Sequence, residues 1–169
     1  MNQGARRYDL LKKGQHPFAV VVSCSDSRVP PELLFDQALG DLFVVRVAGN
    51  VVTPVELGSI EYAVEHLNVP LIMVLGHEEC GAVTAAVEGG VSHGNISAIL
   101  AKIQPSVKDG QSEGLTGTAL IEKSIELNIH NSLKDIAASP IIKEYIETKG
   151  LQIVGFKYDL DEGRVAVID

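Results

Sequence analysis

The sequence predicts an α/β fold: a mainly parallel, four- to five-stranded sheet flanked by helices, with an antiparallel strand at its C-terminal edge. Two patterns lead to this prediction. Short apolar runs rich in β-branched residues, typical of buried parallel strands, alternate with segments of helical periodicity. Near the C-terminus, a turn at 161–163 separates two strand candidates at hairpin spacing, so the last strand is expected to run antiparallel. The 169 residues fit one domain, 1–169.

The first half of the chain supplies three predicted strands. Each is a continuous apolar run that is short for a helix and close to a proline or a turn residue. These runs are residues 18–23 (FAVVVS), 42–47 (LFVVRV) and 71–75 (LIMVL).

Helices are expected around and between these strands. A short polar and basic helix over 5–13 belongs to an N-terminal arm of about residues 1–14. Proline opens the next two helices, 31–37 and 54–67, because it fits the first turn of a helix. The second of these has apolar residues at helical spacing, at positions 57, 60, 63, 64 and 67.

The second half of the chain has a less regular pattern. An Ala-rich helix is expected at 80–87, and Gly-rich stretches at 89–94 and 110–117 flank a further helix at 96–104. The remaining predicted elements are helices over 119–138 and 140–148 and strands over 151–158 and 164–168.

Charge and hydropathy exclude several classes of partner. Lys and Arg number 14 against 22 Asp and Glu, a formal net charge of −8, which disfavours nucleic acid and anionic membrane surfaces. No apolar run approaches the ~20 residues needed to span a bilayer. The polar N-terminus lacks the apolar segment of a signal peptide, so we expect a cytoplasmic protein.

Two of the predicted strands are followed by residues suited to metal binding. Cys24-Ser25-Asp26-Ser27-Arg28 follows the first strand, and His77-Glu78-Glu79-Cys80 follows the third. Carboxyl ends of parallel strands share one edge of a sheet, so these side chains converge if the two strands are neighbours. Two thiolates and one imidazole form a zinc set, and a catalytic zinc keeps its fourth position open. Arg28 is spaced to pair with Asp26, which would hold that carboxylate away from the metal.

Each of these residues has an ordinary structural interpretation when taken singly. A lone His77 is more often a structural histidine than a ligand, and Cys24 and Cys80 are more often small core residues. A disulfide between the two cysteines is a further alternative. The combined pattern of Cys24-x-Asp26-x-Arg28 with His77-x-x-Cys80 favours a metal site.

The sequence resembles the β-class carbonic anhydrases. The resemblance is carried by CSDSR at 24–28 and HEEC at 77–80. It extends to PPELLFDQALGDLFVVRVAGN (30–50), GSIEYAV (58–64), VLGH (74–77) and IVGFKYDLDEGRV (153–165). It implies one zinc ion per chain on Cys24, His77 and Cys80, with Asp26 and Arg28 as a catalytic dyad. The implied reaction is the reversible hydration of carbon dioxide to bicarbonate and a proton.

The resemblance also implies a substrate pocket and an oligomer. Its positions here are Gln15, Phe43, Ala48, Tyr62 and Gly81, with Ala48 smaller than the residue the family often has. The glutamine of relatives reaches the neighbouring subunit's site, so a homodimer is expected. A tetramer is the alternative, and the short N-terminal arm preceding the first strand leaves the choice between dimer and tetramer open.

Other functions remain open on the same residues. A hydrolase of carbonyl sulfide or carbon disulfide would use an identical zinc set. A non-catalytic zinc protein would need a fourth ligand, and only Asp26 is placed to supply one.

The resemblance also raises the question of a closed site. Some relatives close it by ligating zinc with the dyad carboxylate, with bicarbonate bound at Trp, Arg and Tyr in a separate pocket. Val21, Arg46 and Tyr62 occupy these positions, and the chain has no Trp. We therefore expect an open site at neutral pH, with Asp26 a zinc ligand only in a closed state.

Overall fold

The computed structural model describes residues 3–90 and 93–168 and contains the predicted sheet. Its five strands lie in the order β2-β1-β3-β4-β5. The first four run parallel, and β5 pairs with β4 in the antiparallel sense, which confirms the predicted fold class. The strands are β1 (Ala19–Ser23), β2 (Leu42–Arg46), β3 (Leu71–His77), β4 (Gln152–Asp159) and β5 (Arg164–Ile168).

Strand order brings the ends of β1 and β3 together. The chain crosses from β1 to β2 on one side and then returns to β3 on the other, so the order reverses at β1. Ser23 at the end of β1 pairs with Leu75 of β3. Residues just beyond this pair therefore meet at the switch point of the sheet, where ligands bind in open α/β folds.

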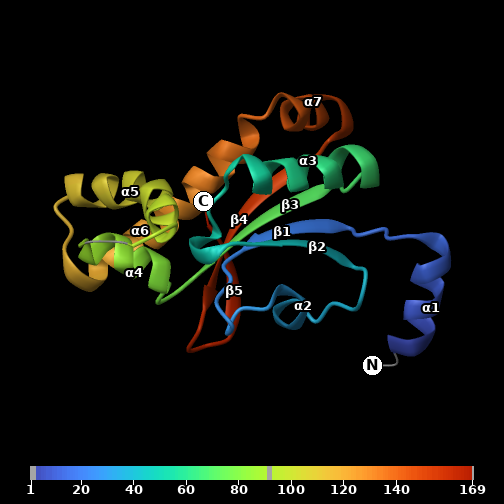
Figure 1. Ribbon diagram of the computed structural model, residues 1–169, viewed down its shortest axis with the longest axis horizontal. Coiled ribbons are helices and arrows are strands. Elements are labelled where there is room, and N and C mark those ends of the chain that lie inside the picture. The colour runs from blue at the N-terminus through green and yellow to red at the C-terminus, as the bar shows by residue number, and fades with distance from the viewer. Residues whose placement is uncertain (1–2, 91–92, 169) are drawn as a thin grey trace.

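Helices lie on both faces of the sheet. In Figure 1, α3 and α7 lie on one side of the sheet and α2 on the other. α1 lies beyond the amino ends of β1 and β2, and α4 beyond the carboxyl end of β3 (Figure 1). The helices are α1 (Gln3–Lys13), α2 (Pro31–Leu34), α3 (Pro54–Leu67), α4 (Gly81–Glu88), α5 (Ile96–Ser112), α6 (Gly117–Ala137) and α7 (Pro140–Lys149), with a 3₁₀ turn η1 (Ala48–Asn50).

Side chains that alternate between the two faces of the sheet divide the core into two layers. Val20 and Val22 of β1 point to the face covered by α3, α6 and α7, where most of the buried apolar side chains gather. Val21 points to the opposite face, in a smaller cluster with Met73 and Leu75 against the region of α2. Side chains of successive strand residues point to opposite faces, so a continuous apolar run fits a sheet covered on both sides.

One predicted boundary was wrong. The helix expected at 96–104 continues to Ser112, through Pro105 and into the Gly-rich stretch at 110–117 that we expected to flank it. Buried Ile103 and Val107 hold both sides of Pro105 in the core. Gly110 allows close packing, because a Cβ there would lie 2.8 Å from Leu120 Cδ1 of α6. The other elements agree with the prediction to within a few residues, apart from η1, which was not predicted.

None of the helices in the described part of the chain is both long enough and apolar enough to cross a membrane.

Candidate active site

The carboxyl ends of β1 and β3 bring three potential metal ligands together. Cys24 directly follows β1, His77 is the last residue of β3, and Cys80 directly precedes α4. One ligand atom from each lies within 4.8 Å of the other two, and all three residues are buried. The two cysteines are 56 positions apart in the sequence, and the parallel pairing of β1 with β3 brings them together.

The spacing of the two sulfurs fits a shared metal ion. The Cys24 and Cys80 Sγ atoms are 4.0 Å apart, and both cysteines are free. A disulfide needs about 2.05 Å, so that alternative does not describe this structure. Two sulfurs bound at about 2.3 Å to a tetrahedral zinc ion lie about 3.8 Å apart. The observed separation is therefore close to what zinc requires.

His77 presents a free nitrogen to the two sulfurs. Its Nδ1 atom lies 2.7 Å from the Glu78 carbonyl oxygen, which can only accept a hydrogen bond, so Nδ1 carries the proton. The other ring nitrogen, Nε2, therefore has a free lone pair. Nε2 is buried and has no hydrogen-bond partner. A buried nitrogen without a partner is costly unless something binds it, and a metal ion is the partner that fits.

The pKa values of the two cysteine thiols are shifted in opposite directions. The pKa of Cys24 is lowered to about 4, chiefly by the hydrogen bond from Cys80 and against the effect of burial. His77 and the backbone N–H groups of Gly49 and Asp26 lower it further. Hydrogen bonding to Cys24 and burial both raise the pKa of Cys80. The pair thus favours one thiolate and one thiol, and a divalent cation would displace the remaining proton.

Burial and the Cys24 thiolate act in opposite directions on His77. Burial disfavours the imidazolium, but the nearby Cys24 thiolate outweighs it and raises the pKa of His77. The ring is therefore set in a negatively polarised site, which again favours a cation among the three ligands.

Asp26 and Arg28 form a bidentate ion pair beside this cluster. Arg28 Nε donates to Asp26 Oδ1 at 3.1 Å, and Nη2 donates to Oδ2 at 2.9 Å. The backbone N–H of Arg28 donates to Oδ1 as well, at 2.9 Å. These hydrogen bonds lower the pKa of Asp26 to about 2. The Oδ2 atom is 3.9 Å from Nε2 of His77, so an ionised carboxylate borders the ligand set.

Two residues that sequence reasoning did not assign to this site shape its loops. Arg46, at the end of β2, donates from Nε to the Cys24 carbonyl at 2.9 Å and from Nη2 to the Asp26 carbonyl at 2.6 Å. Glu79 has a left-handed backbone (φ 51°), which turns the chain between His77 and Cys80. Arg46 had been matched only to an anion pocket, and nothing in the sequence marks a side chain that holds backbone carbonyls.

The residues predicted to line the substrate pocket fall into two groups. Ala48 precedes Gly49, whose N–H donates to the Cys24 sulfur, and Gly81 follows Cys80, so both lie at the ligand cluster. Phe43 does not, since it pairs with Val20, four residues before Cys24 and therefore about 13 Å away along the strand.

Tyr62 and Gln15 also lie away from this chain's own ligand cluster. Tyr62 is 48% exposed, with its ring centroid 6.4 Å from that of Phe43. Gln15 is exposed and precedes β1, at the amino end of a strand whose carboxyl end leads to Cys24. One chain therefore presents these side chains and the candidate metal ligands at opposite ends of the sheet.

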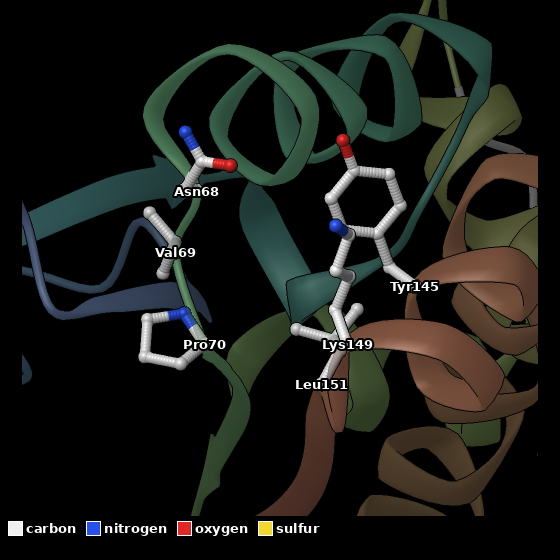
Figure 2. Close-up of a pocket in the computed structure, with 6 residues that line it drawn as sticks. All are labelled: Asn68, Val69, Pro70, Tyr145, Lys149 and Leu151. Atoms are coloured by element: carbon white, nitrogen blue, oxygen red, sulfur yellow. The ribbon is translucent and has the colours of Figure 1, made fainter.

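A separate cavity of about 150 Å³ lies at the amino ends of β3 and β4. Figure 2 shows Asn68, Val69 and Pro70 on one side of it and Tyr145, Lys149 and Leu151 on the other. These lining residues include no Cys, His, Asp or Glu, so they do not form a metal site. The candidate active site is the cluster at the carboxyl ends.

Comparison with known proteins gives consistent matches. The family profile described as carbonic anhydrase matches residues 19–165. Carbonic anhydrase 2 of Mycobacterium tuberculosis is 44% identical over 164 residues, covering 94% of this chain and 78% of its own. A carbonic anhydrase of Mycolicibacterium smegmatis is 43% identical over 169 residues, covering 97% and 81%.

Solved structures agree with the sequence relatives. A tetrameric β-carbonic anhydrase of Sordaria macrospora superposes with a TM-score of 0.91 at 30% identity, covering 98% of this chain and 87% of its own. A β-carbonic anhydrase of Aspergillus fumigatus gives 0.89 at 30% identity, covering 99% and 84%. The profile spans most of the chain and both kinds of relative cover nearly all of it, so this chain belongs to the β-class carbonic anhydrases, a family of enzymes.

Proposed function

We propose that this chain catalyses the reversible hydration of carbon dioxide to bicarbonate and a proton, using one zinc ion per chain held by Cys24, His77 and Cys80. The observation that carries the proposal is the buried ligand cluster with an unpartnered His77 Nε2, bordered by the Asp26–Arg28 pair. The chemistry that zinc supplies when bound is Lewis acidity, which lowers the pKa of a water molecule toward about 7.

Asp26 orients the attacking water in this proposal. Its carboxylate accepts a hydrogen bond from the water, so an oxygen lone pair is directed at the carbon of carbon dioxide. Arg28 keeps Asp26 ionised and in place through two parallel hydrogen bonds. An oxygen–carbon bond forms, bicarbonate leaves, and the water's proton passes to buffer.

A second copy of the chain completes the substrate pocket in this proposal. Gln15, Phe43 and Tyr62 lie away from their own chain's ligands, so they serve the site of a partner subunit. There Gln15 donates to the developing bicarbonate oxygen, and Phe43 and Tyr62 supply an apolar wall for a small apolar substrate. The tetrameric relative from Sordaria macrospora supports an assembly, and we propose a homodimer as its smallest unit. A cytoplasmic location remains a prediction.

The non-catalytic alternative would require a closed set of four ligands. Asp26 is the carboxylate nearest to His77 Nε2, and both of its oxygens accept from Arg28. This pairing favours an open fourth position and therefore a catalytic site.

Stopped-flow measurement of carbon dioxide hydration tests the proposal. Zinc-loaded protein should accelerate hydration, chelation should abolish the activity, and added zinc should restore it. Cys80→Ser should lose both zinc and activity, with Ser97→Ala on the exposed start of α5 as a control that keeps both. Zinc-loaded protein that hydrates carbon dioxide no faster than buffer would contradict the proposal. Faster release of hydrogen sulfide from carbonyl sulfide would instead identify that molecule as the substrate.

A further inference from the structure

The η1 turn lies directly against one of the metal-ligating sulfurs. The backbone N–H of Gly49 donates to Cys24 Sγ at 3.2 Å. Gly49 has φ 71° and ψ 20°, a left-handed conformation that glycine adopts without strain. A Cβ at this position would also lie 2.8 Å from Ile103 Cδ1. Conformation and space therefore both require glycine where the chain meets the sulfur.

Helix α6 holds this turn from the other side. Asn128 Nδ2 donates to the Gly49 carbonyl at 2.7 Å, and Ser132 Oγ donates to the Asn50 carbonyl at 2.9 Å. Both side chains are 2% exposed and lie four residues apart, on one face of the helix. The neighbouring backbone carbonyls of η1 are thus fixed by neighbouring turns of α6.

The position of α6 is itself tightly defined. A Cβ at Gly76 of β3 would lie 2.5 Å from Ile129 Cδ1, and one at Gly155 of β4 would lie 3.1 Å from Ile129 Cγ2. Ile129 is fully buried. Because the helix rests on two strands at positions without side chains, the Asn128 amide has little freedom to follow a moving turn.

The hydrogen bond from Asn128 to the Gly49 carbonyl matters because a glycine backbone has little conformational preference of its own. The N–H and C=O groups of Gly49 belong to two peptide planes that meet at its Cα, and glycine rotates about that atom more freely than other residues. The bond from Asn128 fixes one plane, and so restricts the direction in which the N–H of the other can point. Removing it would leave a buried carbonyl without a partner, and the turn would rotate to relieve this.

The hydrogen bond to sulfur affects how the thiolate binds a metal. The partners of Cys24 Sγ are Cys80 and the backbone N–H groups of Asp26 and Gly49, at 3.4 Å and 3.2 Å for the two N–H groups. An N–H donor draws electron density from sulfur and weakens its donation to a metal. Two thiolates reduce the acidity of a zinc ion more than imidazoles do, so an N–H bond to sulfur restores part of that acidity.

We propose that Asn128 is a positioning residue of the metal centre: by holding the Gly49 carbonyl, it keeps the Gly49 N–H on the Cys24 sulfur and so sets the donor strength of that thiolate. The inference rests on the metal-ligand set of the proposed function. It assigns a role in metal chemistry to a residue of a helix that supplies no ligand.

Cobalt(II) substitution provides a test with a spectroscopic readout. Asn128→Leu removes the donor while excluding water, and the thiolate-to-cobalt charge-transfer band should move to longer wavelength because the sulfur becomes easier to oxidise. If Asn128→Leu does not fold, Asn128→Ala, which adds no bulk, takes its place with a shift in the same direction expected.

Asn131→Leu is the matched control. It makes the same change three residues further along α6, where the amide donates to Ser106 Oγ at 2.9 Å and not to η1. Its band should stay at the wild-type position. An unchanged band in Asn128→Leu, or an equal shift in Asn131→Leu, would overturn the role of Asn128 and leave the metal set standing. A wild-type protein without any thiolate-to-cobalt band would overturn the metal set itself.

Discussion

Two carboxylates next to the ligand cluster have very different surroundings. The side chain of Asp26 is 19% exposed and accepts from Arg28 with both oxygens, whereas that of Glu79 is 75% exposed. The pKa of Asp26 falls from its ordinary 3.8 to about 2 because of the Arg28 hydrogen bonds. Since the folded pKa is the lower one, the pairing stabilises the folded chain above about pH 4 and is lost as the pH falls toward 2. Asp26 is thus ionised at neutral pH.

Replacing this carboxylate by an amide should separate catalysis from metal binding. Asp26→Asn keeps the shape of the side chain but removes the ionised acceptor that we propose orients the attacking water. Zinc content should stay near one per chain, and carbon dioxide hydration should slow by about 100- to 10,000-fold. Metal analysis and stopped-flow assays measure the two quantities. Asp9→Asn on the exposed face of α1 is the matched control, and near-normal hydration by Asp26→Asn would exclude the carboxylate from the mechanism.

The convergence of the candidate ligands could be predicted from the sequence because each has a distinctive side chain at the end of a predicted strand. Cys24 and His77 were placed together by the parallel pairing of β1 and β3 alone. Arg46 and Asn128 could not be found this way, since both act on backbone carbonyls. Any residue has a carbonyl, so such contacts leave no pattern in the sequence and depend on the packed structure.

Helix α3 shows how a short motif stabilises an element that covers the sheet. Thr53 and Glu56 form a capping box at its N-terminus, in which the Thr53 N–H donates to Glu56 Oε2 at 3.0 Å. Burial disfavours the charged form of Glu56, but hydrogen bonds from Thr53 outweigh it and lower the pKa. The charged cap therefore stabilises the folded chain above the ordinary pKa of 4.5, and this contribution disappears as the pH falls through the lower, folded value.

Glu56→Gln should accordingly destabilise the protein in a pH-dependent manner. We expect the free energy of unfolding to fall by about 1 kcal/mol at pH 7. The difference from wild type should shrink as the pH falls below about 4.5 and vanish below the lower, folded pKa, where both chains carry a neutral side chain. Urea unfolding at several pH values measures it. The matched control is Glu65→Gln in the last turn of the same helix, and an equal, pH-independent loss in both variants would argue against the cap.

Elements were predictable where local signals agreed with packing. Pro54 and the apolar spacing after it predicted the bounds of α3, Pro54–Leu67. In α5 the local signals opposed the structure, because Pro105 and Gly110 are poor helix formers. Burial of neighbouring side chains and the close approach of Leu120 determine that helix, and neither is visible in a local window.

At the scale of the whole molecule, the separation of the pocket residues from the ligands makes a prediction about shared sites. Gln15→Ala retains the candidate metal ligands and lacks the proposed donor, whereas Cys80→Ser retains that donor and lacks a ligand. Refolding the two together should form mixed dimers with one intact site each, and random mixing gives about a quarter of wild-type activity per chain. Each variant refolded alone is the control. Light scattering that shows a fully active monomer would contradict shared sites.

Regulation by bicarbonate is a further prediction at this scale. Val21 is buried within the sheet, and the Arg46 guanidinium donates to the carbonyls of Cys24 and Asp26. An anion pocket on these positions would have to compete for that guanidinium. Steady-state assays should therefore show only product competition by millimolar bicarbonate near pH 7.5, and a steep, cooperative loss of activity would contradict this. Assembly and regulation were the least predictable from the sequence, because both depend on surfaces of more than one chain.

The order of the strands also has a consequence in time. In chain order β1, β2 and β3 precede the other two strands, so all three candidate metal ligands have been made once residue 80 is reached. The partner of β3 on its other side, β4, begins only at Gln152, and α6, which covers that face, begins at Gly117. A nascent chain therefore carries these candidate ligands well before the sheet is complete, with α3 the only one of the three covering helices yet made. Pairing β3 with β4 must close a long loop, which is a slow step in folding.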